Sequence, residues 1–154
     1  MIDSDNPVVR LCAAGMALDG EPDAARALFQ QAWDSRRDDY EASIAAHYLA
    51  RHQSLPADSL YWNHLAVEHA EAVPDGRAQL LLASLYLNLA ESYRTLARPA
   101  HALIATERGI AALEFLPLDG YRSFVANGLQ RLRARLGAGD PHSADILACV
   151  EPDE

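Results

Sequence analysis

This sequence of 154 residues contains no lysine, few aromatic residues and only two cysteines. All 13 basic residues are therefore arginines, which indicates either a GC-rich codon bias or the use of arginine as a bidentate clamp for carboxylate or phosphate. The spacing of Cys12 and Cys149 matches no metal or redox motif. Few aromatics beside many Ala and Leu residues favour helices that pack through small and aliphatic side chains.

Long apolar runs are also missing. No segment approaches the ~20 apolar residues that span a bilayer, and the start of the chain lacks the basic and apolar regions of a signal peptide. These absences predict a cytoplasmic protein with no membrane contact. The formal net charge of -9 repels phosphate backbones, so the composition argues against binding to nucleic acid.

Signatures of catalysis are missing as well. The serines have no glycine elbow around them, and Gly137-Ala138-Gly139 follows a helical segment, where it is interpreted as a stop signal and not as a phosphate loop. Four carboxylates cluster at one predicted loop and are expected to be solvated: Asp34, Asp38, Asp39 and Glu41. The sequence therefore predicts neither an enzyme nor a cofactor or metal.

What the sequence does contain is helical periodicity from end to end. The predicted helices cover about residues 7–19, 22–33, 40–53, 58–73, 77–96, 99–116 and 121–136. Asn6 and Asp58 are predicted N-caps, and Pro7 suits a first helical turn. We expect one helical domain over 1–139, followed by a loose tail over 140–154 with at most one helical turn near 144–150.

Small residues recur where paired helices would have to touch. The aligned sets are Ala25, Phe29 and Ala32 with Ala102, Thr106 and Gly109, and Cys12-Ala13 and Met16 with Leu89-Ala90 and Tyr93. In this alignment the turns Gly20-Glu21-Pro22 and Ala97-Arg98-Pro99 coincide. We therefore expect close helix contacts at four alanines, which are Ala13, Ala25, Ala90 and Ala102.

This pattern resembles the tetratricopeptide repeat (TPR) family over about residues 6–136. The third hairpin carries it best, in the run Leu89-Ala90…Tyr93…Ala97-Arg98-Pro99…Ala102…Gly109. The second hairpin departs from it, because His47 stands where the family has Gly or Ala. The long fourth and fifth helices look like the long-repeat variant found in bacterial regulatory proteins and kinesin light chains.

The resemblance implies an all-α fold, a right-handed α-solenoid of three TPR-like hairpins plus a C-terminal capping helix. It also implies a non-catalytic scaffold or adaptor whose concave groove, lined by the first helix of each pair, binds a peptide or protein. The predicted groove residues are Arg10, Tyr48, Arg51, His52, Asn88, Glu91, Arg94, Asn127 and Arg131. Arg10, Asn88, Arg94 and Asn127 would form a carboxylate clamp, although Ala14 stands where an Asn is expected.

Other interpretations stay open. The groove residues could be ordinary solvated side chains, or the chain could be a regulatory sensor for a small signal or oligopeptide. A metalloprotein would use the cluster His47, His52, His64 and His69, with Glu68 four residues after His64. The apolar ends of a short array favour a homodimer, with Val8, Val9, Leu11 or Trp33 at such an end.

Overall fold

The computed structural model describes residues 3–139, and every regular element in that range is helical. The helices are α1 (Pro7–Met16), α2 (Pro22–Asp34), α3 (Asp39–Ala50), α4 (Pro56–Ala72), α5 (Gln79–Thr95), α6 (Pro99–Ala112) and α7 (Gly120–Gly139). A short 3-10 helix, η1 (Leu113–Phe115), follows α6. The expected all-α class is confirmed over these residues. None of the helices between residues 3 and 139 combines the length and apolar character that a membrane crossing needs.

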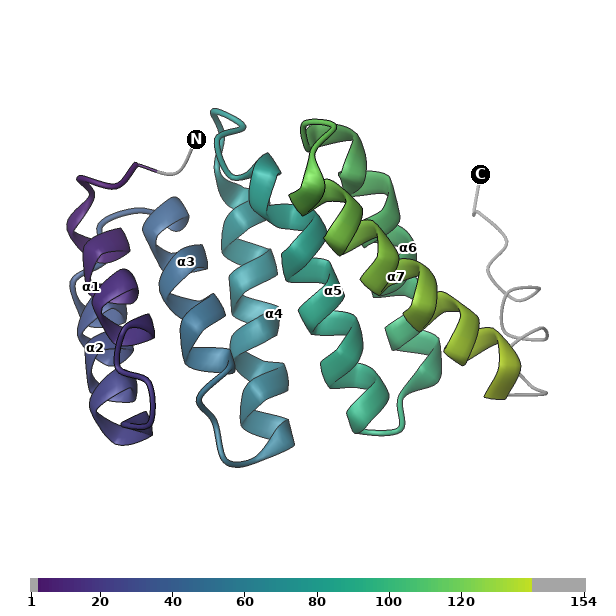
Figure 1. The fold of residues 1–154 in the computed structure, drawn as a ribbon, viewed down its shortest axis with the longest axis horizontal. Coiled ribbons are helices and arrows are strands. Elements are labelled where there is room, and N and C mark those ends of the chain that lie inside the picture. Colours follow the sequence, from purple (N-terminus) through teal and green to yellow (C-terminus); the bar gives the residue numbers. More distant parts are fainter. Residues whose placement is uncertain (1–2, 140–154) are drawn as a thin grey trace.

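The helices follow one another along the long axis of the molecule, from α1 at one end to α7 at the other (Figure 1). Each helix packs against the next one in the chain, and α1 also packs on α3 and α5 on α7. In the view of Figure 1, α1 lies in front of α2 and α7 lies in front of α6. α1 and α7 thus lie on the viewer's side of the row, and α2 and α6 lie behind them.

Local sequence signals account for most helix starts. The Asn6 side chain caps α1, because its Oδ1 accepts hydrogen bonds from the amides of Val8 at 2.9 Å and Val9 at 3.2 Å. Proline occupies the first turn of α1, α2, α4 and α6, where its missing N–H costs no hydrogen bond. Gly20 adopts a φ of 81° in the first turn of the chain, which fits the predicted break there.

Three of the four expected alanine contacts are confirmed by burial. Ala25 is 2% exposed, and Ala90 and Ala102 have no exposed surface. Close packing is also visible at Gly109, where a methyl group would lie 2.7 Å from Cδ2 of Leu129 on α7. Small side chains therefore do set the approach of these helices.

The fourth expectation is wrong, because Ala13 is exposed. The close approach on α1 falls on Gly15, where a methyl group would lie 2.5 Å from the ring of Phe29. α1 ends at Met16, so its last turn lies directly against α2. The residue of α1 that makes the close contact is therefore Gly15 and not Ala13.

Several predicted boundaries are also corrected. α4 begins at Pro56, so Asp58 lies in its first turn and does not cap it. α5 begins at Gln79 and not at Arg77, and α7 continues past Gly137, which is no stop signal. Glycine in a helix interior is tolerated at a cost of about 1 kcal/mol. The predicted tail over 140–154 lies outside the described residues.

The prediction that Glu41 is solvated is wrong, because this residue is only 1% exposed. Its carboxylate accepts hydrogen bonds from Asn6 Nδ2 at 2.8 Å, from the Arg37 amide at 2.7 Å and from Arg37 Nη2 at 2.6 Å. The hydrogen bond from the Arg37 guanidinium, followed by the one from Asn6, holds the pKa of Glu41 below its ordinary value. One buried carboxylate thus joins the start of α1 to α3.

The expected apolar end is only partly exposed. Val8 is buried, and Val9, Leu11 and Trp33 are half-buried against the core. Trp33 packs edge-on against Trp62, with 4.9 Å between ring centroids. The exposed large apolar residues lie elsewhere, and they include Met16, Leu118, Tyr121 and Phe124.

Candidate functional site

Arg51, directly after α3, lies between two hollows of the surface. The hollow toward α1 and α2 has a volume of about 420 Å³, and Tyr48, Arg51 and His52 line it together with Met16 and Leu18. These five residues come from α1, from α3 and from the connections that follow these two helices. Three of the predicted groove residues are brought together here.

The second hollow lies on the other side of Arg51, between the end of α3, the start of α4 and the end of α5. Its volume is about 360 Å³, and Arg51, Asn88 and Glu91 line it with Asn63 and Ser92. Arg51 therefore belongs to both hollows. Three of the predicted groove residues, which are Arg51, Asn88 and Glu91, thus line this hollow together.

The side of the site toward α2 is held rigidly by aromatic contacts. The ring of Tyr48 stacks on Phe29 at 5.4 Å, and the ring of His52 lies 4.7 Å from Phe29. Arg26 Nε donates a hydrogen bond to the carbonyl oxygen of His52 at 3.0 Å. Burial raises the pKa of Tyr48, so its hydroxyl remains a neutral donor and acceptor.

The side chain of His47 positions Asn88. Burial, assisted by the charge of Arg51, lowers the pKa of His47 to about 4, so its imidazole is neutral near pH 7. Asn88 Nδ2 lies 3.4 Å from His47 Nδ1, which in the neutral ring can accept its hydrogen bond. The histidine that departs from the family pattern therefore supports a residue of the candidate site.

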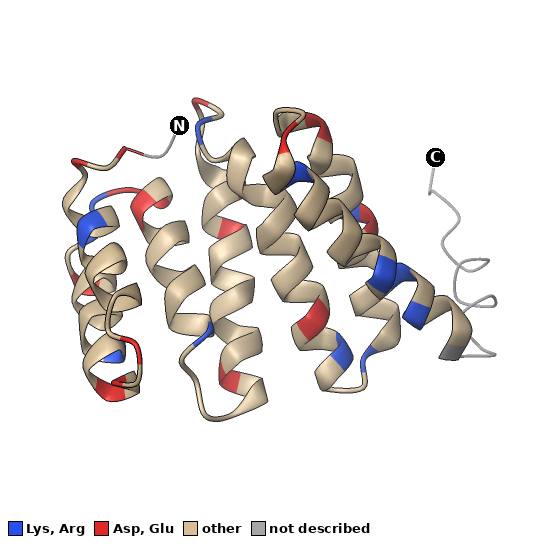
Figure 2. Ribbon diagram, viewed as in Figure 1, with Lys and Arg blue, Asp and Glu red and all other residues tan. Residues whose placement is uncertain are grey.

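The charges of the site are unevenly compensated. Arg94 Nε pairs with Glu91 Oε2 at 2.7 Å, so these two predicted groove residues largely neutralise each other. Arg51 is exposed and forms no salt bridge with any residue of the range 3–139. Charged residues elsewhere lie mostly near helix ends and connections (Figure 2). Arg51 is the free cation at the centre of the two hollows.

The remaining predicted residues are not part of this arrangement. Arg10 on α1, Arg94 on α5, and Asn127 and Arg131 on α7 are exposed, and none of them lines either hollow. The proposed clamp of Arg10, Asn88, Arg94 and Asn127 therefore does not gather around one point beside Arg51. Only Asn88 of this set lines a hollow.

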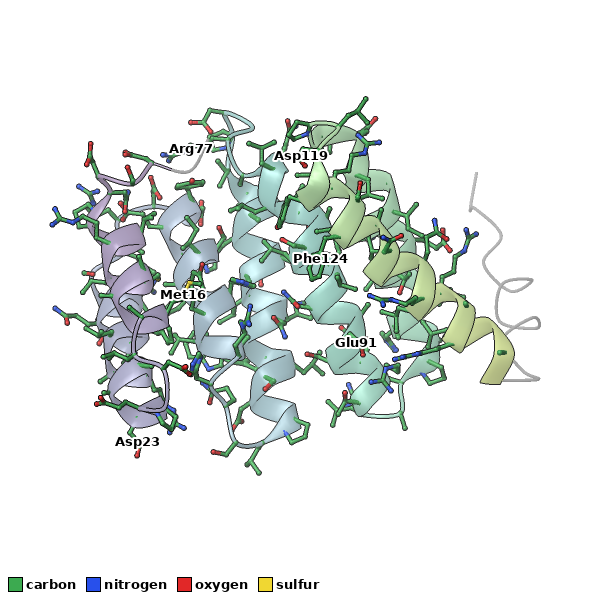
Figure 3. All side chains as sticks on the ribbon, in the orientation of Figure 1. Met16, Asp23, Arg77, Glu91, Asp119 and Phe124 are labelled. Carbon is green, nitrogen blue, oxygen red and sulfur yellow. The ribbon has the colours of Figure 1, made fainter. Side chains whose placement is uncertain are left out.

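Two exposed apolar side chains belong to the candidate surface: Met16 lines the first hollow, and Phe124 lines neither hollow. Met16 on α1 is 59% exposed and Phe124 on α7 is 68% exposed. In Figure 3, Met16 lies toward the α1 end of the row and Phe124 lies toward the α7 end. Phe124 is not part of the core, to which α7 contributes the buried Val125 and Leu129.

Two further residues of the site, Asn63 and Ser92, were not predicted from the sequence. Asn63 is only 6% exposed, and its Nδ2 donates a hydrogen bond to Ser92 Oγ at 2.8 Å. They lie on neighbouring helices, α4 and α5, so no spacing within one segment links them. Polar residues at otherwise apolar helix positions were the only available signal.

The four histidines lie apart. His52 packs on Phe29, His64 faces Tyr93 at 6.5 Å, and His69 Nδ1 pairs with Asp39 Oδ1 at 2.8 Å. Within residues 3–139 no three His, Cys, Asp or Glu side chains lie close enough to hold a metal ion together. The geometry of the described residues thus gives the metalloprotein alternative no support.

No protein-family model, curated protein or solved structure matches the chain. A guanidinium, two amides, a phenol and the carboxylates of Asp19 and Glu91 surround the open space of the candidate site beside exposed apolar side chains. Such groups bind carboxylates, peptide groups and apolar side chains.

Proposed function

We propose that this chain is a non-catalytic, TPR-like scaffold that binds a peptide or protein segment along the side formed by α1, α3, α5 and α7. The observation that carries the proposal is the position of Arg51. It lines both hollows, it is exposed, and no carboxylate of the described residues pairs with it. An uncompensated cation between two hollows suits an anionic group on a partner.

The helix packing supports the scaffold part of this proposal. In it, α1–α2, α3–α4 and α5–α6 are three hairpins of a right-handed solenoid, and α7 is the cap. The contacts of α1 with α3 and of α5 with α7 are those expected when successive hairpins stack. Buried alanines at the hairpin contacts suit the same interpretation.

The site also suggests the chemistry of the partner segment. A carboxylate would pair with the guanidinium of Arg51, and a neighbouring apolar side chain would enter the hollow beside Tyr48 and Met16. Asn88 and Asn63 would lie beside the peptide backbone in the second hollow. Arg94 contributes less, because Glu91 already compensates its charge.

Selection from a displayed library of random peptides tests the proposal. We expect enriched peptides that combine an acidic and an apolar residue, and that bind Arg51→Gln about tenfold more weakly, since a hydrogen bond to a charged group contributes about 1.5–3 kcal/mol. Arg98→Gln is the matched control, because Arg98 is exposed and lines neither hollow. It should bind as the wild type does.

Two outcomes contradict the proposal. One is a selection that enriches no peptide, and the other is equal affinity of the wild type and Arg51→Gln for every enriched peptide. Sedimentation equilibrium of the free chain measures its oligomeric state as a further test. A stable dimer that excludes the selected peptides would make a second copy of the chain the occupant of this surface.

A further inference from the structure

A third hollow lies between α4 and α6, with residues of α5 between them. Its volume is about 260 Å³, and it shares no lining residue with the two hollows beside Arg51. Val67, Leu89 and Ala105 give it a buried apolar base, and Ile104 lies at its edge with 54% of its surface exposed. An aliphatic side chain is thus left in water beside an apolar depression.

Aromatic rings form one part of this hollow. Tyr93 of α5 lies between two histidines, with ring centroids 5.1 Å from His101 and 6.5 Å from His64. The His101 ring is tilted by 31° to the tyrosine, and the His64 ring meets it nearly edge-on at 84°. All three line the hollow. A π-electron surface of this kind attracts organic cations.

Two charged side chains of this hollow, Glu71 and Arg108, are hydrogen-bonded to the buried Tyr86. The Tyr86 hydroxyl donates a hydrogen bond to Glu71 Oε1 and accepts one from Arg108 Nη1 at 3.4 Å. Burial, and then the hydrogen bond to Glu71, raises the pKa of Tyr86, so the phenol is neutral and can make both contacts. Glu71 and Arg108 therefore compensate each other through Tyr86.

Glu68 is left without compensation. It lies on α4, four residues after His64, and it lines the same hollow. Its carboxylate is exposed and has no hydrogen bond or salt bridge to another residue of the described chain. With Glu71 and Arg108 paired through Tyr86, Glu68 gives the hollow a net negative charge.

We propose that this hollow binds an organic ammonium ion on a short apolar body. The apolar body would contact Leu89 and Ile104, and the ammonium group would lie between the Glu68 carboxylate and the ring of Tyr93. The volume is below the roughly 300–1,000 Å³ of pockets for drug-sized ligands, so the ligand is compact. The ammonium group belongs either to a free amine or to a lysine side chain of a peptide.

This inference does not depend on the peptide groove, and it is tested on the full chain by following amide and side-chain resonances. Phenethylamine is the probe, and phenethyl alcohol and hydrocinnamate are its neutral and anionic counterparts. We expect phenethylamine to shift the resonances of Tyr93 and Ile104 and to bind about fivefold or more tightly than the alcohol, as one partly exposed ion pair permits. The anionic probe should bind most weakly.

A lysine with both ends blocked as amides identifies the source. Tighter binding of the blocked lysine assigns the site to a peptide side chain, and tighter binding of phenethylamine assigns it to a free amine. Either result supports the ammonium proposal. If neither probe shifts any resonance of the hollow at millimolar concentration, the proposal is overturned.

Matched variants test the part played by the carboxylate. Glu68→Gln removes one charge from an exposed position and should weaken phenethylamine binding about fivefold, to the level of the alcohol. Glu114→Gln makes the same charge change at an exposed residue of η1 outside the hollow and should leave binding unchanged. Equal binding of amine and alcohol, or unchanged amine binding by Glu68→Gln with native helicity, would also overturn the proposal.

Discussion

The pairs α1–α2 and α5–α6 have equivalent second helices but different first helices. On the second helices every aligned residue is buried, as the sequence alignment predicts: Ala25, Phe29 and Ala32 on α2, and Ala102, Thr106 and Gly109 on α6. On the first helices the aligned alanines differ. Ala90 has no exposed surface, whereas Ala13 faces solvent and Gly15 makes the close contact.

The connections explain this difference. Residues 17–21 lead from α1 to α2, whereas only residues 96–98 join α5 to α6. An extended chain covers ~3.3 Å per residue, whereas a helix rises only 1.5 Å per residue. The longer connection after α1 therefore lets this helix end soon after its close contact, because the connection itself reaches α2. Turn geometry thus decides which residue of a periodic helix makes the contact.

The two pairs are also joined to their neighbours by different chemistry. Buried polar contacts of Glu41 tie the start of α1 to α3, whereas apolar contacts such as Gly109 with Leu129 tie α6 to α7. Polar anchors should respond to pH and to loss of one partner, and apolar contacts to changes of side-chain volume. The following variants test this comparison.

Glu41→Ala should give the largest effect. Asn6 and the Arg37 amide would lose their acceptor, and we expect the free energy of unfolding in urea to fall by about 3–5 kcal/mol. The control Glu21→Ala changes an exposed residue of the α1–α2 connection and should stay within about 0.5 kcal/mol of the wild type. Equal effects of the two variants would show that the carboxylate is no anchor.

The same anchor predicts a pH dependence. The pKa of Glu41 is lowered in the folded state, so its stabilisation is complete above the ordinary pKa of a glutamate and is lost as the pH falls through the lower folded value. The difference between wild type and Glu41→Ala should therefore shrink in acid. A constant difference across this range would contradict the charged hydrogen bonds.

His47, at the aligned position of the α3–α4 pair, should give the next largest effect. Its pKa is about 4 in the folded protein and 6.5 ordinarily, so between these values the unfolded state binds more protons and the folded state loses stability as the pH falls. The loss from pH 7 to pH 4 is about 3 kcal/mol. His47→Gln should remove it from the unfolding curves, whereas the exposed His101→Gln should not.

Leucine substitutions then separate the two aligned alanines. Ala90→Leu should overpack α5 against its neighbours and destabilise the protein by about 1–3 kcal/mol. Ala13→Leu adds the same atoms to an exposed site and should change the free energy of unfolding by less than about 0.5 kcal/mol. Equal losses would mean that Ala13, and not Gly15, makes the contact in solution.

Periodicity and turn residues predicted the helical class, the seven α-helices of residues 3–139 and the buried residues of α2 and α6. They could not predict the close contact of Gly15, because it depends on where α1 ends. They also could not predict the exposure of Phe124, because α7 buries only the face toward α5 and α6. Glu41 was misjudged since a carboxylate beside other carboxylates is usually solvated, and its partners Asn6 and Arg37 meet only in three dimensions. Residues near Arg51 were predicted, but not Asn63 and Ser92, whose contact joins two helices.

The turns of the two pairs offer the finest test of the comparison. Gly20 and Ala97 both have positive φ, at 81° and 54°, but only glycine adopts this region without steric cost. Ala97→Gly should remove about 1–2 kcal/mol of steric strain from the folded state. The more flexible glycine also stabilises the unfolded chain by about 0.5–1 kcal/mol. The free energy of unfolding in urea should therefore rise by about 0.5–1 kcal/mol. Gly20→Ala should do the opposite, because the added methyl meets nothing within 4 Å and only the backbone conformation opposes it. A loss of stability in Ala97→Gly would mean that the α5–α6 turn does not use a left-handed residue, and the similarity of the two turns would then be lost.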